Sequence, residues 1–307
     1  MKKVLLTGAS GFIGRHTIPL MIESGYEVHA IFHTAQPLFK QDKSLFWHKC
    51  NLLNTNQQRS LLAEVKPTHL LHFAWYTTPG KYWVSLENLR WIQASLEILM
   101  NFVDEGGKRV VLAGTCAEYD WNYGYCSEGI TLTRPQTLYG TCKNSLQEIL
   151  SQFSNQTGIS SAWGRIFFLY GPYEAKNRLV PSVITSLLQD RPARCSHGNQ
   201  IRDFLHVKDV ASAFVSLLDS NVEGPINIAS GQPVALKTII YTIGDLLGKK
   251  HLVELGALPP PENEPPFLVA DVRKITQQVG WKPKITLEAG LKSTIEWWKE
   301  NIERNKI

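Results

Sequence analysis

The fold is decided by the stretch Thr7-Gly8-Ala9-Ser10-Gly11-Phe12-Ile13-Gly14, which directly follows a short apolar run near the N-terminus. Its glycines are spaced G-x-x-G-x-x-G between an expected strand and an expected helix. Glycine lets a backbone approach a pyrophosphate closely, and the first turn of a helix presents free N–H groups to it. The stretch therefore predicts a dinucleotide-binding loop, against the alternative of a tight structural turn. The residues expected to contact the cofactor are Gly8, Ser10, Gly11, Phe12, Ile13 and Gly14.

Around this loop, short apolar runs alternate with segments of helical periodicity as far as about residue 170. Such alternation is typical of βαβ units, and strands this apolar are covered on both faces. The pattern predicts an α/β fold with a doubly wound parallel sheet. The expected strands are 3–7, 27–32, 45–49, 69–73, 109–113 and 161–165, and the expected helices are about 11–24, 85–105 and 137–157.

The pattern changes after about residue 165. Turn residues and a proline-rich stretch at 258–267 break the alternation into short irregular pieces, so we expect a second, smaller region there. Within it we expect a strand at 203–207 and helices at about 210–220 and 287–304.

The composition excludes several classes of protein. The chain has 307 residues, and no apolar run approaches the ~20 residues that a membrane-spanning helix needs. No signal-peptide core follows Met1-Lys2-Lys3, so a cytoplasmic location is expected. The net charge of +5 is dispersed, which gives no support for nucleic-acid binding but suits an anionic ligand. Five cysteines without a C-x-x-C pair predict free thiols and no metal site.

The end of the expected second strand bears on the choice of dinucleotide. It lacks the Asp or Glu that would bind the adenosine ribose hydroxyls and repel a 2′-phosphate. This absence favours NADP, with NAD as the alternative. His33 and Arg15 could lie near such a phosphate, or be a merely exposed histidine and a solvated arginine.

A second candidate group combines Tyr139, Lys143 and Thr115. The tyrosine and the lysine are four residues apart, hence on one face of the expected helix. The nearby ammonium is expected to favour the phenolate and so to lower the pKa of Tyr139. A Y-x-x-x-K pair is common by itself. Its weight comes from Thr115, just past a strand end, at the edge where α/β sheets bind ligands.

Together these motifs resemble those of the extended short-chain dehydrogenase/reductase family, in its nucleotide-sugar branch of epimerases, dehydratases and 4-ketoreductases. The resemblance covers the whole chain. The motifs that carry it are T-G-A-S-G-F-I-G at 7–14, L-L-H-F-A at 70–74, T-C-A-E-Y at 115–119, Y-G-T-C-K at 139–143, G-R at 164–165, Y-G-P at 170–172 and R-D-F-L-H-V-K-D-V at 202–210.

The resemblance implies a Rossmann-type domain formed by 1–168 and about 203–228. A smaller nucleotide-sugar-binding domain would comprise 169–202 and 229–307, with the site in the cleft between the two. It also implies a homodimer formed through the two helices expected near 85–105 and 137–157.

The resemblance assigns chemical roles to the second candidate group. Tyr139 corresponds to the general acid/base, and Lys143 to the cation that also holds the nicotinamide ribose. Thr115 corresponds to the hydroxyl that bonds the reacting sugar oxygen. The three would form a site for proton and hydride transfer.

Further positions correspond to cofactor contacts of the family. Asn51, followed by Leu52, stands where the family often has an aspartate that contacts adenine, and an amide could still serve there. Phe73 and Ala74 match the loop that passes under the cofactor. His72 is expected to be a buried structural histidine rather than a catalyst.

Two arginines match the family's diphosphate and nucleoside contacts. Arg202 is the stronger candidate and Arg178 the weaker, since a guanidinium can make two charge-assisted bonds to a diphosphate. Each could instead pair with a neighbouring acid such as Asp203 or Glu174.

An aromatic stretch at 74–83 is expected to form a substrate wall. It includes Trp75 and Tyr76, whose rings combine an apolar face with a polar tip, and Pro79-Gly80 places the stretch on a loop. Core packing is the alternative.

The reaction type follows from the residues beside Thr115. In the family's 4,6-dehydratases the threonine is followed by Asp-Glu, and here Cys116 and Ala117 stand instead, which leaves elimination without an evident acid and base. An NADPH-dependent 4-ketoreductase of a nucleoside-diphosphate-4-keto-6-deoxyhexose is therefore favoured, since the ribose-binding acid is missing. The alternatives are an NAD-dependent 4-epimerase and, more remotely, a non-catalytic NADP-binding sensor.

Overall fold

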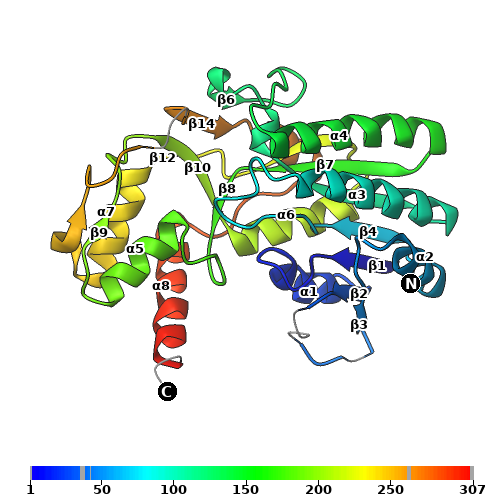
Figure 1. Ribbon diagram of the computed structural model, residues 1–307, viewed down its shortest axis with the longest axis horizontal. Coiled ribbons are helices and arrows are strands. Elements are labelled where there is room, and N and C mark those ends of the chain that lie inside the picture. The colour runs from blue at the N-terminus through cyan, green and yellow to red at the C-terminus, as the bar shows by residue number, and fades with distance from the viewer. Residues whose placement is uncertain (1, 35–38, 42, 261–263, 305–307) are drawn as a thin grey trace.

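A seven-stranded sheet organises the larger part of the molecule (Figure 1). The computed structural model describes residues 2–34, 39–41, 43–260 and 264–304. The strand order is β11-β7-β5-β4-β1-β2-β3, and every pairing along this path is parallel. The strands are β1 (Lys2–Thr7), β2 (Tyr26–Phe32), β3 (Leu45–Lys49), β4 (His69–His72), β5 (Arg109–Thr115), β7 (Ser160–Ile166) and β11 (Gly224–Ile228).

Helices cover both faces of this sheet, which confirms the expected doubly wound α/β fold. One face packs on α1 and α6, and the other on α2, α3 and α4. All seven residues of β5 are buried, as a strand covered on both sides requires. The bounds are α1 (Gly14–Glu23), α2 (Thr55–Val65), α3 (Glu87–Asp104), α4 (Leu138–Thr157) and α6 (Val207–Asp219).

Local chemistry explains where these helices begin and end. The Thr137 hydroxyl accepts the Gly140 N–H at the start of α4, and Gly158 ends it in the left-handed conformation. The expected first helix began three residues too early. The Gly11 N–H donates to the Gly8 carbonyl at 2.9 Å, so the chain is still turning there and α1 begins at Gly14.

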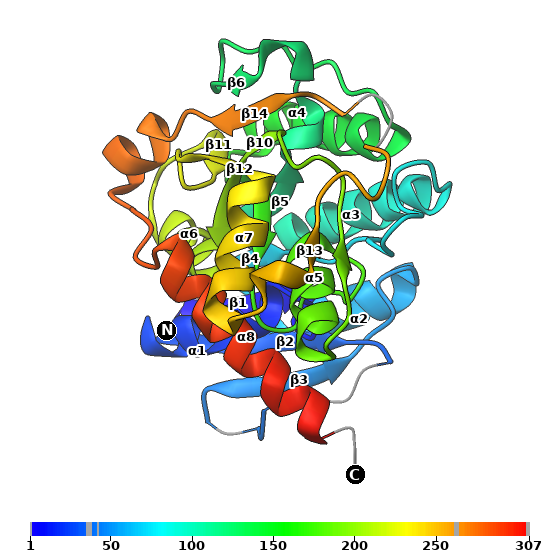
Figure 2. The same cartoon turned by 90° about the vertical axis from the view of Figure 1, so that its left-hand side faces the viewer.

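A smaller unit is built on a second sheet, with the order β12-β10-β14-β6 and with β8 also paired to β10. A third apolar core packs α5, α7 and α8 together, and Figure 2 shows these helices grouped on its near side. The elements are β6 (Tyr125–Cys126), β8 (Phe168–Tyr170), α5 (Leu179–Leu188), β9 (Ala193–Arg194), β10 (Ile201–His206), β12 (Pro233–Ala235), α7 (Leu236–Leu247), β13 (Val253–Glu254), β14 (Phe267–Ala270) and α8 (Leu287–Arg304).

Two helices of this unit, α5 and α7, were absent from the sequence-based expectation. Helix α5 contains Pro181 in its first turn, where a proline is tolerated, and its residues are apolar on nearly every side. Helix α7 follows β12 directly, and Ala235 at its N-cap supplies no capping side chain. Neither helix therefore carries a start signal, although α7 does bury Ile239, Ile240 and Ile243 on one face, which is a periodicity that the sequence-based expectation missed.

The chain crosses between the two sheets several times. Strand β10 belongs to the smaller sheet, whereas α6 and β11, which follow it, join the larger one. The excursion between β5 and α4 contributes β6 to the smaller sheet. The segment that follows β5 therefore connects the larger sheet, through β5, to the smaller sheet, through β6.

Two general features complete the description. All five cysteines are buried free thiols, as expected. Among the described residues, no helix combines the length and the apolar character needed to cross a membrane.

Candidate active site

The glycine loop lies between β1 and α1, packed against the end of β4. Gly8 has φ +65°, and a Cβ there would lie 2.9 Å from the Ala74 nitrogen and 3.1 Å from the Phe73 Cβ. A Cβ on Gly14 would overlap the Gly8 carbonyl oxygen. Each of these two positions therefore excludes a side chain for a steric reason.

The loop fits a dinucleotide pyrophosphate. The backbone N–H groups of Phe12 and Ile13 find no acceptor within the described part of the chain. They stand at the N-terminus of α1, whose dipole favours an anion. The chain's own loop thus offers free donors where a pyrophosphate would bind.

Thr7 and His72 fix the loop to β4. The Thr7 hydroxyl accepts the Ala74 N–H at 3.1 Å and lies 2.9 Å from the His72 Nδ1. The His72 Nε2 lies 3.0 Å from the Ser95 hydroxyl. Burial lowers the pKa of His72 to about 3, so the ring is neutral. His72 is the structural histidine that the sequence suggested.

Asn51, Leu52 and His33 are the residues expected near adenosine, and Asn51 makes hydrogen bonds within the chain. The Asn51 N–H donates to the Gln57 side chain at 2.8 Å, and the Asn51 Oδ1 accepts the Leu53 N–H at 3.0 Å. Leu52 is buried beside them. His33 is exposed just beyond β2. The C-terminal part of β2 and the residues just beyond it, 28–34, contain no acidic side chain.

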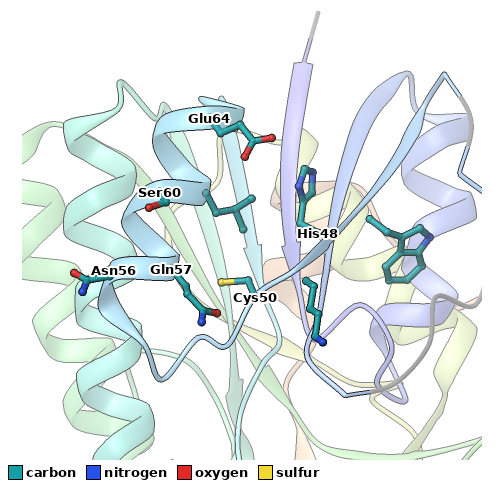
Figure 3. Close-up of a pocket in the computed structure, with 9 residues that line it drawn as sticks. His48, Cys50, Asn56, Gln57, Ser60 and Glu64 are labelled. Atoms are coloured by element: carbon teal, nitrogen blue, oxygen red, sulfur yellow. The ribbon is translucent and has the colours of Figure 1, made fainter.

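A cavity of about 460 Å³ lies between β3 and α2 (Figure 3). It is lined from β3 by His48 and from α2 by Gln57 and Glu64, among others. None of the residues expected at the site lines this cavity, so it lies outside the candidate active site.

Thr115, Tyr139 and Lys143 come together at the end of β5, as expected. The Thr115 side chain lies close enough to the Tyr139 phenol to lower its pKa, against the larger effect of burial. The Lys143 ammonium is buried, donates to the Ala113 carbonyl at 2.8 Å and lies 3.8 Å from the ring centroid of Trp75.

The expected effect of Lys143 on the pKa of Tyr139 is wrong. Burial raises the pKa of Tyr139, and the lysine is not among the groups that shift it. Burial also lowers the pKa of Lys143 to about 7, against an opposing contribution from Glu118. The ammonium is directed to Ala113 and Trp75, and the phenol remains protonated at neutral pH.

Glu118 is a part of the site that the sequence analysis missed. It is fully buried and accepts the Thr115 N–H at 2.7 Å and the Trp163 indole N–H at 2.9 Å. Its other oxygen pairs with Arg165 at 2.6 Å. Thr115 and Glu118 form a capping box around a short 3₁₀ turn, and the spacing T-x-x-E was a visible signal for it.

An aromatic wall, formed by Tyr82, Trp83 and Trp121, stands beside Tyr139. The ring centroids of Tyr82 and Trp83 lie 4.9 and 5.7 Å from that of Tyr139, both edge to face. Trp121 lies 6.3 Å from Trp83 and comes from the excursion after β5. The aromatic stretch of the sequence therefore does reach the candidate active site, through its last two members.

Trp75 has the alternative role, core packing. It is 8% exposed, its indole N–H donates to the Asn88 side chain at 2.8 Å, and its ring lies under Lys143. Tyr76 is partly buried against the same core. The burial of Trp75 and its hydrogen bond to Asn88 correct the expectation that it belongs to a substrate wall.

The two arginines differ in their surroundings. Arg202 is 1% exposed, and its guanidinium lies 2.9 Å from a Glu264 carboxylate oxygen and 5.3 Å from the ring centroid of Phe168. Its acidic partner is therefore Glu264 rather than Asp203, whose carboxylate instead accepts the backbone N–H groups of Ser230 and Gly231.

Arg178 approaches the aromatic wall. Its guanidinium lies 3.5 Å from the Tyr82 hydroxyl and 5.5 Å from that ring's centroid. Burial raises the pKa of Glu174 to about 8. The nearby positive charge of Arg178 lowers this pKa, but by less than burial raises it. One Glu174 carboxylate oxygen is buried and finds no hydrogen-bond partner among the described residues.

Known proteins show the same architecture. Three curated relatives match over nearly the whole chain. CDP-abequose synthase of Salmonella typhimurium is 27% identical over 95% of this chain and 97% of its own length. UDP-glucuronate 4-epimerase of Thermodesulfobacterium geofontis is 25% identical over 97% of each. The dTDP-4-dehydro-6-deoxyglucose reductase of Escherichia coli is 24% identical over 95% and 96%.

A solved structure and a family profile complete the comparison. The UDP-N-acetylglucosamine 4-epimerase of Methanobrevibacter ruminantium superposes with a TM-score of 0.88, at 24% identity over 98% of this chain and 99% of that one. The profile of the NAD dependent epimerase/dehydratase family matches residues 4–229, which include the glycine loop and Thr115, Tyr139 and Lys143. The chain is therefore an enzyme that belongs to the NAD dependent epimerase/dehydratase family.

Proposed function

We propose that this enzyme reduces the C4 keto group of a nucleoside-diphosphate-4-keto-6-deoxyhexose, with NADPH as the reductant. The observation that carries the proposal is the environment of Thr115 and Tyr139, where a protonated phenol and a hydroxyl stand beside an aromatic wall and the adjacent carboxylate of Glu118 is held by Arg165 and the Thr115 N–H. The similarity to a dTDP-4-dehydro-6-deoxyglucose reductase supports the same reaction.

Elimination of water lacks its proton carriers here. Cys116 and Ala117 follow Thr115, and burial raises the pKa of the Cys116 thiol. The next residue, Glu118, is held by Arg165, Trp163 and the Thr115 N–H. The carboxylate nearest in sequence therefore has a structural role and does not supply the base that a 4,6-dehydratase would need.

The side chains present match the needs of ketone reduction. Bound NADPH would supply the hydride to C4. The Thr115 hydroxyl would donate a hydrogen bond to O4, and Tyr139 would transfer its phenolic proton to the same oxygen. Burial keeps Tyr139 protonated before the reaction, which is the form that an acid requires. Lys143, buried behind the site and directed to the Ala113 carbonyl and the Trp75 ring, does not act on the phenol in this arrangement.

The preference for NADPH rests on the end of β2. No carboxylate stands within residues 26–34 except Glu27 at the opposite end of the strand, where it pairs with Lys3 and His29. A ribose 2′-phosphate would thus meet the exposed His33 and no repelling acid.

A second candidate function is NAD-dependent 4-epimerisation of a nucleotide sugar. It is favoured by the similarity to a UDP-glucuronate 4-epimerase, and it would use the same Thr115 and Tyr139 to move the O4 proton. It differs in that hydride returns to the sugar, so no cofactor is consumed.

Absorbance at the reduced-nicotinamide band tests the proposal. Purified enzyme is mixed with NADPH or NADH and a nucleoside-diphosphate-4-keto-6-deoxyglucose. Stoichiometric loss of NADPH is expected. No loss of either cofactor, together with NAD released on denaturation of the purified enzyme, would replace the reductase with the epimerase.

We also propose a homodimer formed through α3 and α4. Leu89 and Met100 on α3 are 52% and 45% exposed, and Ile149 on α4 is 43% exposed. Apolar side chains on two adjacent helices suit a four-helix contact. Sedimentation at working concentration is expected to give twice the mass of one chain, and a monomer would exclude the contact.

A further inference from the structure

Tyr173 has an unusual backbone conformation. It has φ 74°, which residues other than glycine seldom adopt. Among the described residues, Lys66 and Asp190 share this sign, but both stand at or just beyond the C-terminal end of a helix, where the left-handed conformation is common. Tyr173 lies in the segment between β8 and α5. It is the third residue of a turn in which the Glu174 N–H donates to the Gly171 carbonyl at 3.3 Å, and its side chain makes further contacts.

The Tyr173 ring connects two parts of the molecule. The Arg15 guanidinium lies 3.9 Å from its centroid, and the Trp297 ring centroid lies 4.6 Å away at an interplanar angle of 53°. His16 is 5.9 Å away, and its Nε2 lies 3.2 Å from the carbonyl of Pro172. Arg15 and His16 belong to α1 of the larger unit, and Trp297 belongs to α8 of the smaller one.

Arg15 links the Tyr173 ring to the glycine loop. Its Nε donates to the Gly11 carbonyl at 3.2 Å, and its Nη2 donates to the Ser10 carbonyl at 2.8 Å. Arg15 is the second residue of α1, where a cation opposes the helix dipole. Its position is therefore not explained by the helix, whereas the two carbonyls and the aromatic ring each hold it in place.

We infer that Tyr173 is a positioning residue for the dinucleotide loop. It holds Arg15 against the Ser10 and Gly11 carbonyls, so that the N–H groups of Phe12 and Ile13 face the pyrophosphate. Through Trp297, the last helix of the smaller unit supports this arrangement. Arg15 is thereby committed to the loop, and recognition of a ribose 2′-phosphate is left to other residues.

The inference rests on the proposed function only in that the loop binds a dinucleotide. The inference therefore predicts a change in dinucleotide binding alone. Loss of the Tyr173 ring should weaken the affinity for NADPH, and it should leave the binding of a nucleoside diphosphate and the chemistry at Tyr139 unchanged.

The test compares Tyr173→Gly with Tyr173→Phe. Glycine removes the ring and relieves the backbone, whereas phenylalanine keeps the ring over Arg15. Titration of unliganded enzyme, followed by nicotinamide fluorescence, measures the dissociation constant of NADPH and of NADH. We expect about a tenfold weaker affinity for both dinucleotides in Tyr173→Gly and a change of about twofold or less in Tyr173→Phe.

Two further variants distinguish a role of Tyr173 in positioning the loop from an effect of relieving its backbone conformation. Lys66→Gly relieves the same kind of backbone conformation at an exposed position, and its dinucleotide affinity should match the wild type. Trp297→Leu keeps an apolar side chain but removes the aromatic support, and it should weaken dinucleotide affinity by a few-fold. This variant also serves if Tyr173→Gly does not fold.

The outcomes distinguish this inference from the proposed function. Wild-type affinity in both Tyr173→Gly and Trp297→Leu would overturn the inference, as would equal weakening in Tyr173→Phe and Tyr173→Gly. An enzyme that binds dinucleotides, responds to the variants as expected, but does not reduce a 4-keto sugar would support the inference and refute the proposed function. Failure to bind either dinucleotide would refute both.

Discussion

The glycine loop and the surroundings of Tyr139 are built in different ways. The loop is made of backbone: close approach at Gly8 and Gly14 excludes side chains, and the free groups are the N–H of Phe12 and Ile13. The surroundings of Tyr139 are made of side chains from distant segments, such as Tyr82 and Trp121. The comparison teaches that a backbone site is encoded by local spacing, whereas a side-chain site needs the tertiary fold.

The largest effect, on kcat, is expected from Tyr139→Phe, which changes the site made of side chains. The variant lacks the proton for O4, so kcat should fall by about 10²–10⁴-fold. The NADPH dissociation constant should change little, because the glycine loop is untouched. Steady-state kinetics and fluorescence titration measure the two quantities. Near-normal turnover would remove the acid role from Tyr139.

Glu118→Gln should have the largest effect on stability. It leaves Arg165 buried without its ionic partner, and breaking a buried pair typically costs about 3–5 kcal/mol. Denaturant unfolding measures the free energy. The control is Glu87→Gln, which removes an exposed pair with Arg90 and should cost about 1 kcal/mol or less. Equal effects of the two substitutions would mean that the buried pair is not needed for stability.

A smaller effect, on the backbone side, is expected from Gly8→Ala. The added Cβ would meet the Ala74 nitrogen at 2.9 Å in a conformation that costs alanine about 1–2 kcal/mol, so NADPH should bind about tenfold more weakly or worse. Isothermal titration measures this affinity. The control is Gly25→Ala, whose φ of +80° is similar but whose added Cβ meets nothing within 4 Å. Similar NADPH affinities in the two variants would show that close packing at Gly8 is unimportant.

The last prediction concerns the pH dependence of stability. The pKa of Glu174 is raised by burial to about 8 in the folded chain, above the value of about 4.3 for an unfolded glutamate. Between these values the folded state binds more protons, so the contribution of Glu174 to stability is lost as the pH rises. Glu174→Gln should therefore show a flatter decline of the free energy of unfolding from pH 5 to pH 8. Parallel curves for the two proteins would place Glu174 in an ordinary solvated environment.

Much of the larger unit could be predicted from the sequence. Its strands are continuous apolar runs, and Gly158 at the end of α4 is a local signal that needs no tertiary information. The meeting of Thr115, Tyr139 and Lys143 also followed from position, since a strand end and the next helix are neighbours in a βαβ unit.

Other features depended on contacts between distant residues. The burial of Tyr139, which raises its pKa, comes from segments far from α4, so the spacing to Lys143 alone gave the wrong direction. Trp75 and Tyr82 lie in one aromatic stretch, but only the fold decides that the first packs under Lys143 and the second faces Tyr139. The pairing of Arg202 with Glu264 likewise joins residues from different parts of the chain.

The central claim is that hydride from NADPH ends at C4 of the sugar. The most direct measurement uses NADPH deuterated at C4 of the nicotinamide, in each stereochemical form, with a nucleoside-diphosphate-4-keto-6-deoxyglucose, and mass spectrometry of the sugar product. We expect one deuterated form to place a single deuterium at C4 of the product for every NADPH consumed. A C4-epimerised nucleotide sugar formed without deuterium and without loss of NADPH would contradict the account.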